Sequence, residues 1–267
     1  MGSYAYYFMG KSDKADELGK LLLDYGRRQT DIRMTAMGHV IIGMGRSAAG
    51  DLLAAIENFQ KAVQISIDPL LTYIGKLLMG YSYVGSEQLE KAEETLEDVM
   101  RFSEASGFEF VRTAARGFQG IVLIAKGNLS QGICIAEEVT KASLEKGNRY
   151  RYALFNYLIG KVYCRIYQRK GSMNLSSMLS NFGFLVKNVL IANKKAEEYL
   201  NEAISMANEI GAKVLLGQAT LELGALYKAK GSSVQAQKYI SEAIKIFRQC
   251  QAEIYLKQAK EALASWG

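Results

Sequence analysis

The feature that most constrains this fold is a glycine followed 12 residues later by a second small residue. In the C-terminal part of the chain the two landmarks are Gly224 and Ala236 (236 − 224). The same offset of 12 separates Gly43 from Ala55, Gly80 from Ala92, and Gly120 from Gly132. Small residues at a constant offset allow two helices to approach closely at the same place in each copy. The pattern therefore predicts a repeated helical unit.

The clearest copy is the stretch from Gly217 to Ala243, which reads as two helices and a turn. Leu223 and Tyr227 give the first half an apolar stripe at helical spacing, and Ile240 belongs to the stripe of the second half. The sequence Gly231-Ser232-Ser233 between them is expected to end one helix and cap the next. Such a helical hairpin cannot bury both of its faces alone, so it needs neighbours.

The period of the first-helix glycine predicts an all-α, right-handed α-solenoid of stacked hairpins. The steps are 37 (80 − 43), 40 (120 − 80), 40 (160 − 120) and 64 (224 − 160). A single proline, Pro69, also favours helix throughout. We expect one domain, 1–267, with a half-repeat at 4–28, repeats at 31–67, 70–106, 108–146, 149–210 and 211–249, and a capping helix at 253–265.

The long step reflects an insertion in the fourth repeat. Gly160 lies 36 residues before Ala196 (196 − 160), so 24 residues are added, and we place them at 170–193. The insert begins polar and becomes apolar toward its end. It is expected either to pack on the solenoid or to present an adhesive surface to a partner.

The half-repeat at 4–28 predicts that the native protein continues upstream, because a solenoid seldom begins with half a hairpin. The alternative is that 13–28 is a true N-terminal cap. At the other end, the amphipathic segment 253–265 has the half-polar character that a terminal repeat requires.

Composition and charge narrow the classes of function. The chain is 49% hydrophobic with a net charge of +6, and no Lys/Arg block of five or more occurs, so nucleic acid is not an expected partner. No apolar run approaches the roughly 18 residues of a membrane span, so no membrane association is expected. Cys134, Cys164 and Cys250 lie far apart in helical patterns, which fits reduced thiols and a cytoplasmic protein.

No motif predicts catalysis, a cofactor or a metal. The glycine-rich stretch 43–50 lacks the Lys-Ser/Thr ending of a phosphate-binding loop. His39 is the single histidine, too few for a typical zinc site or a hydrolase triad. The acidic run at 87–98 is spread around a helix with Lys91 nearby, which is typical of a solvated face. We therefore expect no enzyme activity in this chain.

The candidate binding residues lie on the first helices, which line the concave side of such a solenoid. Apolar positions outside the hairpin stripe predict a groove for an apolar helix or peptide segment, or for neighbouring parts of the same protein. Lys161 and Arg165, four residues apart, share one helix face and could bind a carboxylate or phosphate. The candidates are Met37, Val40, Met44, Leu77, Tyr81, Ile121, Leu154, Tyr157, Lys161 and Arg165. Core packing is an equally good explanation for any single apolar member, and the sequence leaves a homo-oligomer open.

The spacing of glycine, tyrosine, turn glycine and two alanines resembles tetratricopeptide (TPR) repeats over nearly the whole chain. The copies differ from the family in being longer than 34 residues and in lacking the first-helix tryptophan and, except at Pro69, the closing proline. The resemblance implies a protein-binding or scaffold module.

A narrower resemblance concerns the C-terminal half. The segments 183–188, 195–198, 211–213 and 255–263 resemble the repeat region of large bacterial signalling proteins. In those proteins a class III adenylate/guanylate cyclase domain and a STAND-type ATPase domain precede the repeats. The resemblance implies a sensor or scaffold arm whose partner is a protein, including the upstream domains of its own chain. The alternative is a small-molecule-sensing repeat domain of a LuxR-type or STAND regulator.

Overall fold

A computed structural model describes residues 12–168 and 181–265 of the chain. These residues form helices joined by short turns, and no strand occurs among them. They divide into two compact units, unit 1 with residues 1–122 and unit 2 with residues 123–267. The all-α class that the sequence predicts is therefore confirmed for the described part of the chain.

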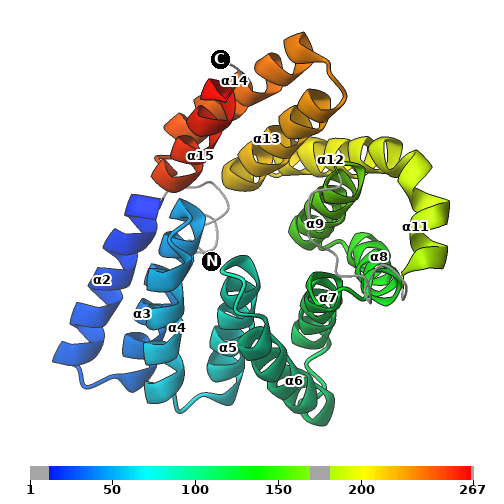
Figure 1. Cartoon of the computed structure of the whole chain (residues 1–267). Helices are drawn as coiled ribbons and strands as arrows, with labels where there is room; N and C mark the ends of the chain where they lie inside the picture. The colour runs from blue at the N-terminus through cyan, green and yellow to red at the C-terminus, as the bar shows by residue number, and fades with distance from the viewer. Residues whose placement is uncertain (1–11, 169–180, 266–267) are drawn as a thin grey trace. The chain divides into compact units, whose positions relative to one another are not determined.

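Unit 1 is a series of antiparallel helices in which, from α2 to α6, each packs on the next along the chain (Figure 1). Its helices are α2 (Ser12–Arg28), α3 (Ile32–Ala49), α4 (Leu52–Ile65), α5 (Pro69–Gly85), α6 (Leu89–Ser106) and α7 (Glu109–Ala125), the last of which runs three residues past the unit boundary. The predicted helix at 13–28 corresponds to α2, whereas Tyr4–Met9 lies outside the described residues.

Unit 2, described by itself, also consists of helices that pack pairwise. Helix α9 contacts α8, α12 and α13, and α13 in turn contacts α12 and α14. Its helices are α8 (Leu129–Glu145), α9 (Arg149–Gln168), α11 (Phe182–Asn188), the 3-10 helix η1 (Val189–Ile191), α12 (Ala192–Glu209), α13 (Lys213–Ala229), α14 (Ser233–Gln249) and α15 (Glu253–Ala264).

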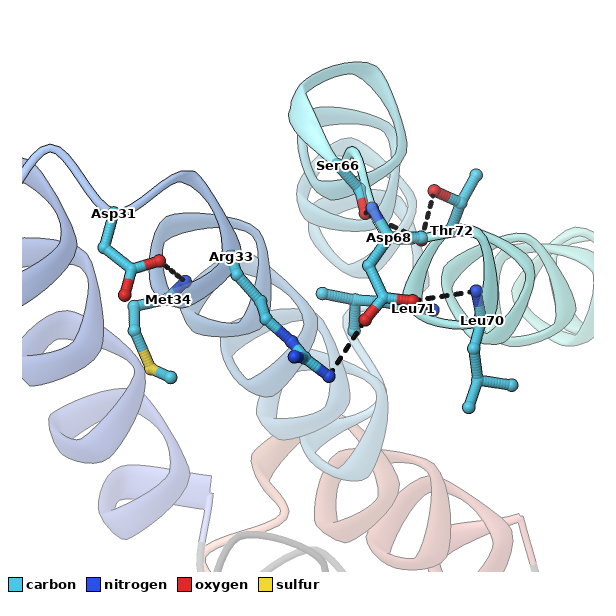
Figure 2. Close-up of polar contacts among 8 residues, drawn as sticks. All are labelled: Asp31, Arg33, Met34, Ser66, Asp68, Leu70, Leu71 and Thr72. Carbon is cyan, nitrogen blue, oxygen red and sulfur yellow. Dashed lines mark hydrogen bonds and ion pairs between the residues drawn. The ribbon is translucent and has the colours of Figure 1, made fainter.

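Aspartate caps explain where several helices of unit 1 begin. The carboxylate of Asp31 accepts a hydrogen bond from the Met34 amide, and Asp68 accepts from the amides of Leu70 and Leu71 (Figure 2). Each bond satisfies a backbone donor that has no partner inside the helix. Pro69 follows Asp68 at the first helical position, where its missing N–H costs nothing. In unit 2, by contrast, Ser232 precedes α14 without a side-chain cap bond, so only the turn at this site is as predicted.

The landmark glycines are the points where the two helices of a hairpin meet. A Cβ added to Gly43 would lie 2.6 Å from the Phe59 ring, and one added to Gly224 would lie 2.7 Å from the Ile240 side chain. In both hairpins the large residue follows the glycine by 16 (59 − 43 and 240 − 224). Gly80 meets Leu96 at the same offset of 16 (96 − 80), and Gly160 meets Leu200. The glycine therefore provides the space that a large second-helix side chain fills.

The described part of the insert is fixed at one point and exposed at another. The buried Asn181 side chain donates to the Gly127 carbonyl and accepts a 2.9 Å bond from the Leu129 amide, which ties it to the turn before α8. Farther along, Leu190 in η1 is 87% exposed. Residues 170–180 of the predicted insert lie outside the described residues.

Candidate functional site

The candidate site with charged side chains lies on α9 in unit 2. Tyr157, Lys161 and Arg165 occur at every fourth position of α9, so they follow one another along a single face of this helix. The helix is held in place by its opposite face, where Phe155, Ile159 and Tyr163 are fully buried. The helix therefore holds the three polar groups in a fixed row, in which Tyr157 is buried, Lys161 is half-buried and Arg165 is exposed.

Lys161 is the charged centre of this row. Its Nζ lies 3.3 Å from the Glu222 carboxylate on α13 and 3.5 Å from the Tyr157 hydroxyl oxygen. The Tyr157 oxygen, opposed by burial and supported by Glu222, raises the pKa of Lys161 above its ordinary value. The amine is therefore a permanent cation whose position two neighbours fix. The negative charge of Glu222 partly offsets the positive charge of Lys161.

Arg165, one turn further along α9, is exposed. Within the described part of the chain no hydrogen bond or ion pair holds its guanidinium, which lies close enough to Lys161 to lower that residue's pKa. A guanidinium in this situation offers a planar set of donors that matches a carboxylate or phosphate. Arg165 is therefore the group in this row that is most available to a partner.

Helices α9 and α13, the first helices of successive hairpins in unit 2, are also joined directly. The Gln168 amide donates to the Ala225 carbonyl at 3.3 Å, and the Cys164 thiol lies 4.0 Å from the Glu222 carbonyl. With the Lys161–Glu222 pair, these contacts hold the two helices at a fixed separation. The face that carries Arg165 is thus part of a pre-formed surface.

The other candidate residues are placed mainly in the interior. Val40 and Met44 are each 3% exposed and belong to the core cluster around Phe59 and Leu71, with Met37 packed against it. Tyr81 is half-buried, its ring 5.1 Å from that of Phe118. The remaining four are buried: Leu77, Ile121, Leu154 and Tyr157. The structure thus divides the ten candidates between the two units and leaves surface mainly at Met37, Tyr81, Lys161 and Arg165.

Unit 2 also contains a polar network around α12. Glu197 accepts a hydrogen bond from the hydroxyl of Tyr227, on α13, at 2.5 Å. It accepts a second from the amine of Lys230, the residue that follows α13, at 2.8 Å. Burial raises the pKa of Glu197, but these two donors outweigh it and hold that pKa below its ordinary value. On the other side of α12, Tyr199 donates to Glu137 at 2.7 Å and Lys195 to the Tyr163 hydroxyl at 3.0 Å.

Sequence reasoning did not find this network. Its partners lie 30 or more residues apart, as Tyr227 and Glu197 do, and no local spacing connects them. The contacts stabilise the position of α12 between its neighbours, because each hydroxyl and amine finds a defined partner. Their role in the geometry of unit 2 is therefore to fix the α9–α12–α13 layer behind the candidate face.

The groups considered for other chemistry have structural surroundings. His39 Nδ1 lies 3.2 Å from the Asn58 amide oxygen, between α3 and α4. Asp98 in the acidic run pairs with Lys76 at 2.5 Å. Among the described residues, no group of three or more His, Cys, Asp or Glu side chains is arranged to hold a metal ion. None of the described helices is both long and apolar enough to span a membrane.

Comparison with known proteins identifies the fold. No protein-family model matches the chain, and no curated protein matches it either. The structure is similar to the crystal structure of BtubC (BKLC) from P. vanneervenii, with a TM-score of 0.50 and 14% sequence identity over 92% of each chain. This similarity of fold, together with the pairwise packing of antiparallel helices, shows that the chain is a TPR-like helical repeat.

Proposed function

We propose that this chain is a protein-binding module whose α9 face in unit 2 binds an acidic peptide segment of a partner. The observation that carries the proposal is Arg165, exposed and without a partner in the described residues, beside a Lys161 fixed by Glu222. Helical repeats with pre-formed faces bind extended or helical peptides with little cost in ordering their own surface. In this proposal the module binds a partner protein and catalyses no reaction.

The distribution of charge supports an acidic partner for unit 2. Unit 1 contains 13 Lys/Arg and 16 Asp/Glu, which leaves 20 and 11 for unit 2 (33 − 13 and 27 − 16). The net charges are therefore −3 and +9 (13 − 16 and 20 − 11). A positive unit attracts an acidic segment over a distance and speeds its encounter, an effect that salt screens.

Peptide binding with matched variants tests the proposal. A labelled glutamate-rich peptide and its glutamine analogue are titrated with the wild-type chain while fluorescence anisotropy is recorded at low and physiological salt. We expect the acidic peptide alone to bind, and Arg165→Glu to weaken its binding about tenfold or more, as loss of a charge-assisted contact does.

The control for Arg165→Glu is Arg248→Glu, which reverses another exposed charge, at the end of α14. Both variants change the net charge of unit 2 by the same amount, so a general electrostatic effect would weaken binding equally in the two. Equal weakening, or no binding of the acidic peptide by the wild-type chain, would contradict the proposed site.

We further propose that the module serves a larger bacterial signalling protein with cyclase and ATPase domains. This proposal rests on the resemblance of segments 183–188, 195–198, 211–213 and 255–263 to the repeat regions of such proteins. A ligand of the module would act on those domains only by binding two of their states unequally. Sequencing the gene upstream of this segment tests the proposal, and an open reading frame without a cyclase or ATPase domain would contradict it.

A further inference from the structure

Exposed apolar side chains gather on one edge of unit 1, where α2 turns into α3, α4 into α5 and α6 into α7. Ile67 in the α4–α5 turn is 76% exposed, and Tyr25, one turn before the end of α2, is 54% exposed. We call this surface the turn edge and define it by Tyr25, Ile32, Ile65, Ile67, Leu70 and Phe108. Large apolar side chains that are exposed at successive turns of one edge are candidates for an interaction site.

Contacts within unit 1 show that the three turns lie side by side. Arg33 at the start of α3 forms a 2.9 Å ion pair with Asp68 in the α4–α5 turn, next to Leu70 (Figure 2). On the other side of that turn, the Tyr73 ring of α5 stacks on the Phe102 ring of α6, with 3.6 Å between the ring centroids. The centroid of the Phe102 ring lies 5.8 Å from that of Phe108. The turn edge is therefore continuous from α3 to α7.

The opposite edge of the same unit differs in character. Among the large apolar side chains described in unit 1, Leu53 is the exposed one near the α3–α4 turn, and the α5–α6 turn consists of Ser86, Glu87 and Gln88. The turn between α8 and α9 in unit 2, Lys146-Gly147-Asn148, occupies the place that corresponds to Ile67 and has no large apolar side chain. The turn geometry therefore does not require an isoleucine at this place.

Three ion pairs at the turn edge form within the unit. Arg28 lies 2.8 Å from Asp24, Arg33 lies 2.9 Å from Asp68, and Arg112 on α7 lies 2.7 Å from Glu109. Acidic and basic groups thus alternate along an edge that is close to neutral. Such an edge offers no net electrostatic attraction to a highly charged partner or to an anionic membrane. A second copy related by a two-fold axis can place its acids opposite these bases.

We propose that the turn edge is the interface of a two-fold symmetric dimer between two copies of this chain. In such an isologous interface one patch meets itself, so the patch must be complementary to its own shape and charge. The apolar side chains supply the burial, and the paired charges avoid repulsion of like groups. This interface is independent of the peptide-binding face proposed on α9.

Sedimentation velocity across a wide range of concentration tests the proposal. The wild-type chain is expected to show a monomer–dimer equilibrium, and the double variant Ile67→Ser, Tyr25→Ser to raise the dimer dissociation constant at least tenfold, which corresponds to about 1.4 kcal/mol. Both side chains are largely exposed, and circular dichroism confirms that the variant folds. The matched control Leu53→Ser, 65% exposed at the opposite edge, is expected to leave the constant unchanged.

The other outcomes overturn the proposal. A wild-type chain that stays monomeric at every concentration excludes the dimer, and so does a Leu53→Ser variant that loses the dimer as fully as the double variant. Flotation with phosphatidylcholine vesicles, with and without phosphatidylglycerol, tests whether the turn edge binds a membrane instead of a second copy. A monomer that binds vesicles through Ile67 and Tyr25 would make the edge a membrane contact instead. Failure here leaves peptide binding at Arg165 unaffected, so the two proposals are tested separately.

Discussion

Burial divides the three cysteines into two chemical classes. Cys164 and Cys250 are buried, and burial raises the pKa of both thiols, whereas Cys134 on α8 is exposed. Because the thiolate is the reactive form, a buried thiol with a raised pKa reacts slowly. We expect one thiol to react rapidly with Ellman's reagent in the native chain and all three to react after denaturation. The Cys134→Ser variant should lose the rapid phase, and rapid reaction that persists in this variant would contradict the assignment.

His39 makes stability depend on pH in a predictable direction. Burial lowers the pKa of His39 below 6.5, although the hydrogen bond to Asn58 raises it in part. The unfolded chain therefore binds a proton at His39 more readily than the folded chain, so this residue destabilises the fold as the pH falls below about 6.5. Urea unfolding between about pH 5 and 7 should show a weaker loss of stability in His39→Gln than in the wild type.

The sequence was sufficient to predict that Lys161 and Arg165 belong to one site on α9, but not that Glu222 joins them. The spacing of Lys161 and Arg165 predicted that they share a helix face, because a helix brings residues four apart together. Glu222 lies 61 residues after Lys161 (222 − 161), and only tertiary packing brings it within 3.3 Å. Val40 and Met44 are a second example. Their position on a first helix could be read from the repeat, but their burial depends on α4 and α5, which pack over them.

At the scale of the element, the contact between Gly224 and Ile240 predicts a cost for any side chain there. The Cβ of an alanine would lie 2.7 Å from the Ile240 side chain and 3.2 Å from its backbone nitrogen. Forcing these atoms apart should destabilise the chain by about 1–3 kcal/mol in Gly224→Ala. Gly183→Ala in α11 is the control, since nothing lies within 4 Å of the added atom. Helix propensity should make that variant neutral or slightly more stable in urea unfolding.

The start of α5 predicts a second effect on stability. Asp68→Ala removes hydrogen bonds to the Leu70 and Leu71 amides together with the ion pair to Arg33. Loss of an N-cap of this kind costs about 1 kcal/mol, within a range of roughly 0.5–2. Ser232→Ala at the corresponding position of α14 removes no cap bond and should change the midpoint of thermal unfolding little. A Ser232→Ala effect as large as that of Asp68→Ala would contradict this difference.

The existence of the hairpins could be predicted because three of the landmark glycines report the same contact at the same offset. Gly43, Gly80 and Gly224 each meet a large residue 16 positions later, so the constant offset in sequence is the constant crossing point of two helices. The capping of the helices could be predicted less well. Asp31 and Asp68 form caps, yet Ser232 does not, because whether a hydroxyl reaches a free amide depends on turn geometry that composition does not specify.

At the scale of the whole molecule, contacts follow the order of the chain. In unit 1 the packing runs from α2 to α3, α4, α5 and α6 in sequence, and in unit 2 from α8 through α9, α12, α13 and α14 to α15. Each helix is therefore stabilised mainly by its immediate neighbours. For a repeat array of this kind, stability is approximately a sum of local terms and nearest-neighbour terms. Damage to one hairpin should consequently fall off along the chain instead of lowering the stability of every helix equally.

Gly43→Ala makes this consequence measurable. The added Cβ would lie 2.6 Å from the Phe59 ring, which is 1% exposed in the core of unit 1. Strain at that contact should loosen α3, α4 and α5, because all three contribute to the cluster around Phe59. Hydrogen exchange followed by mass spectrometry should show faster exchange in peptides from these helices. Peptides from α13 and α14 should be unchanged, and the reverse distribution is expected for Gly224→Ala. Equal acceleration throughout the chain in either variant would mean that the helices unfold as one cooperative block, in contradiction to nearest-neighbour stabilisation.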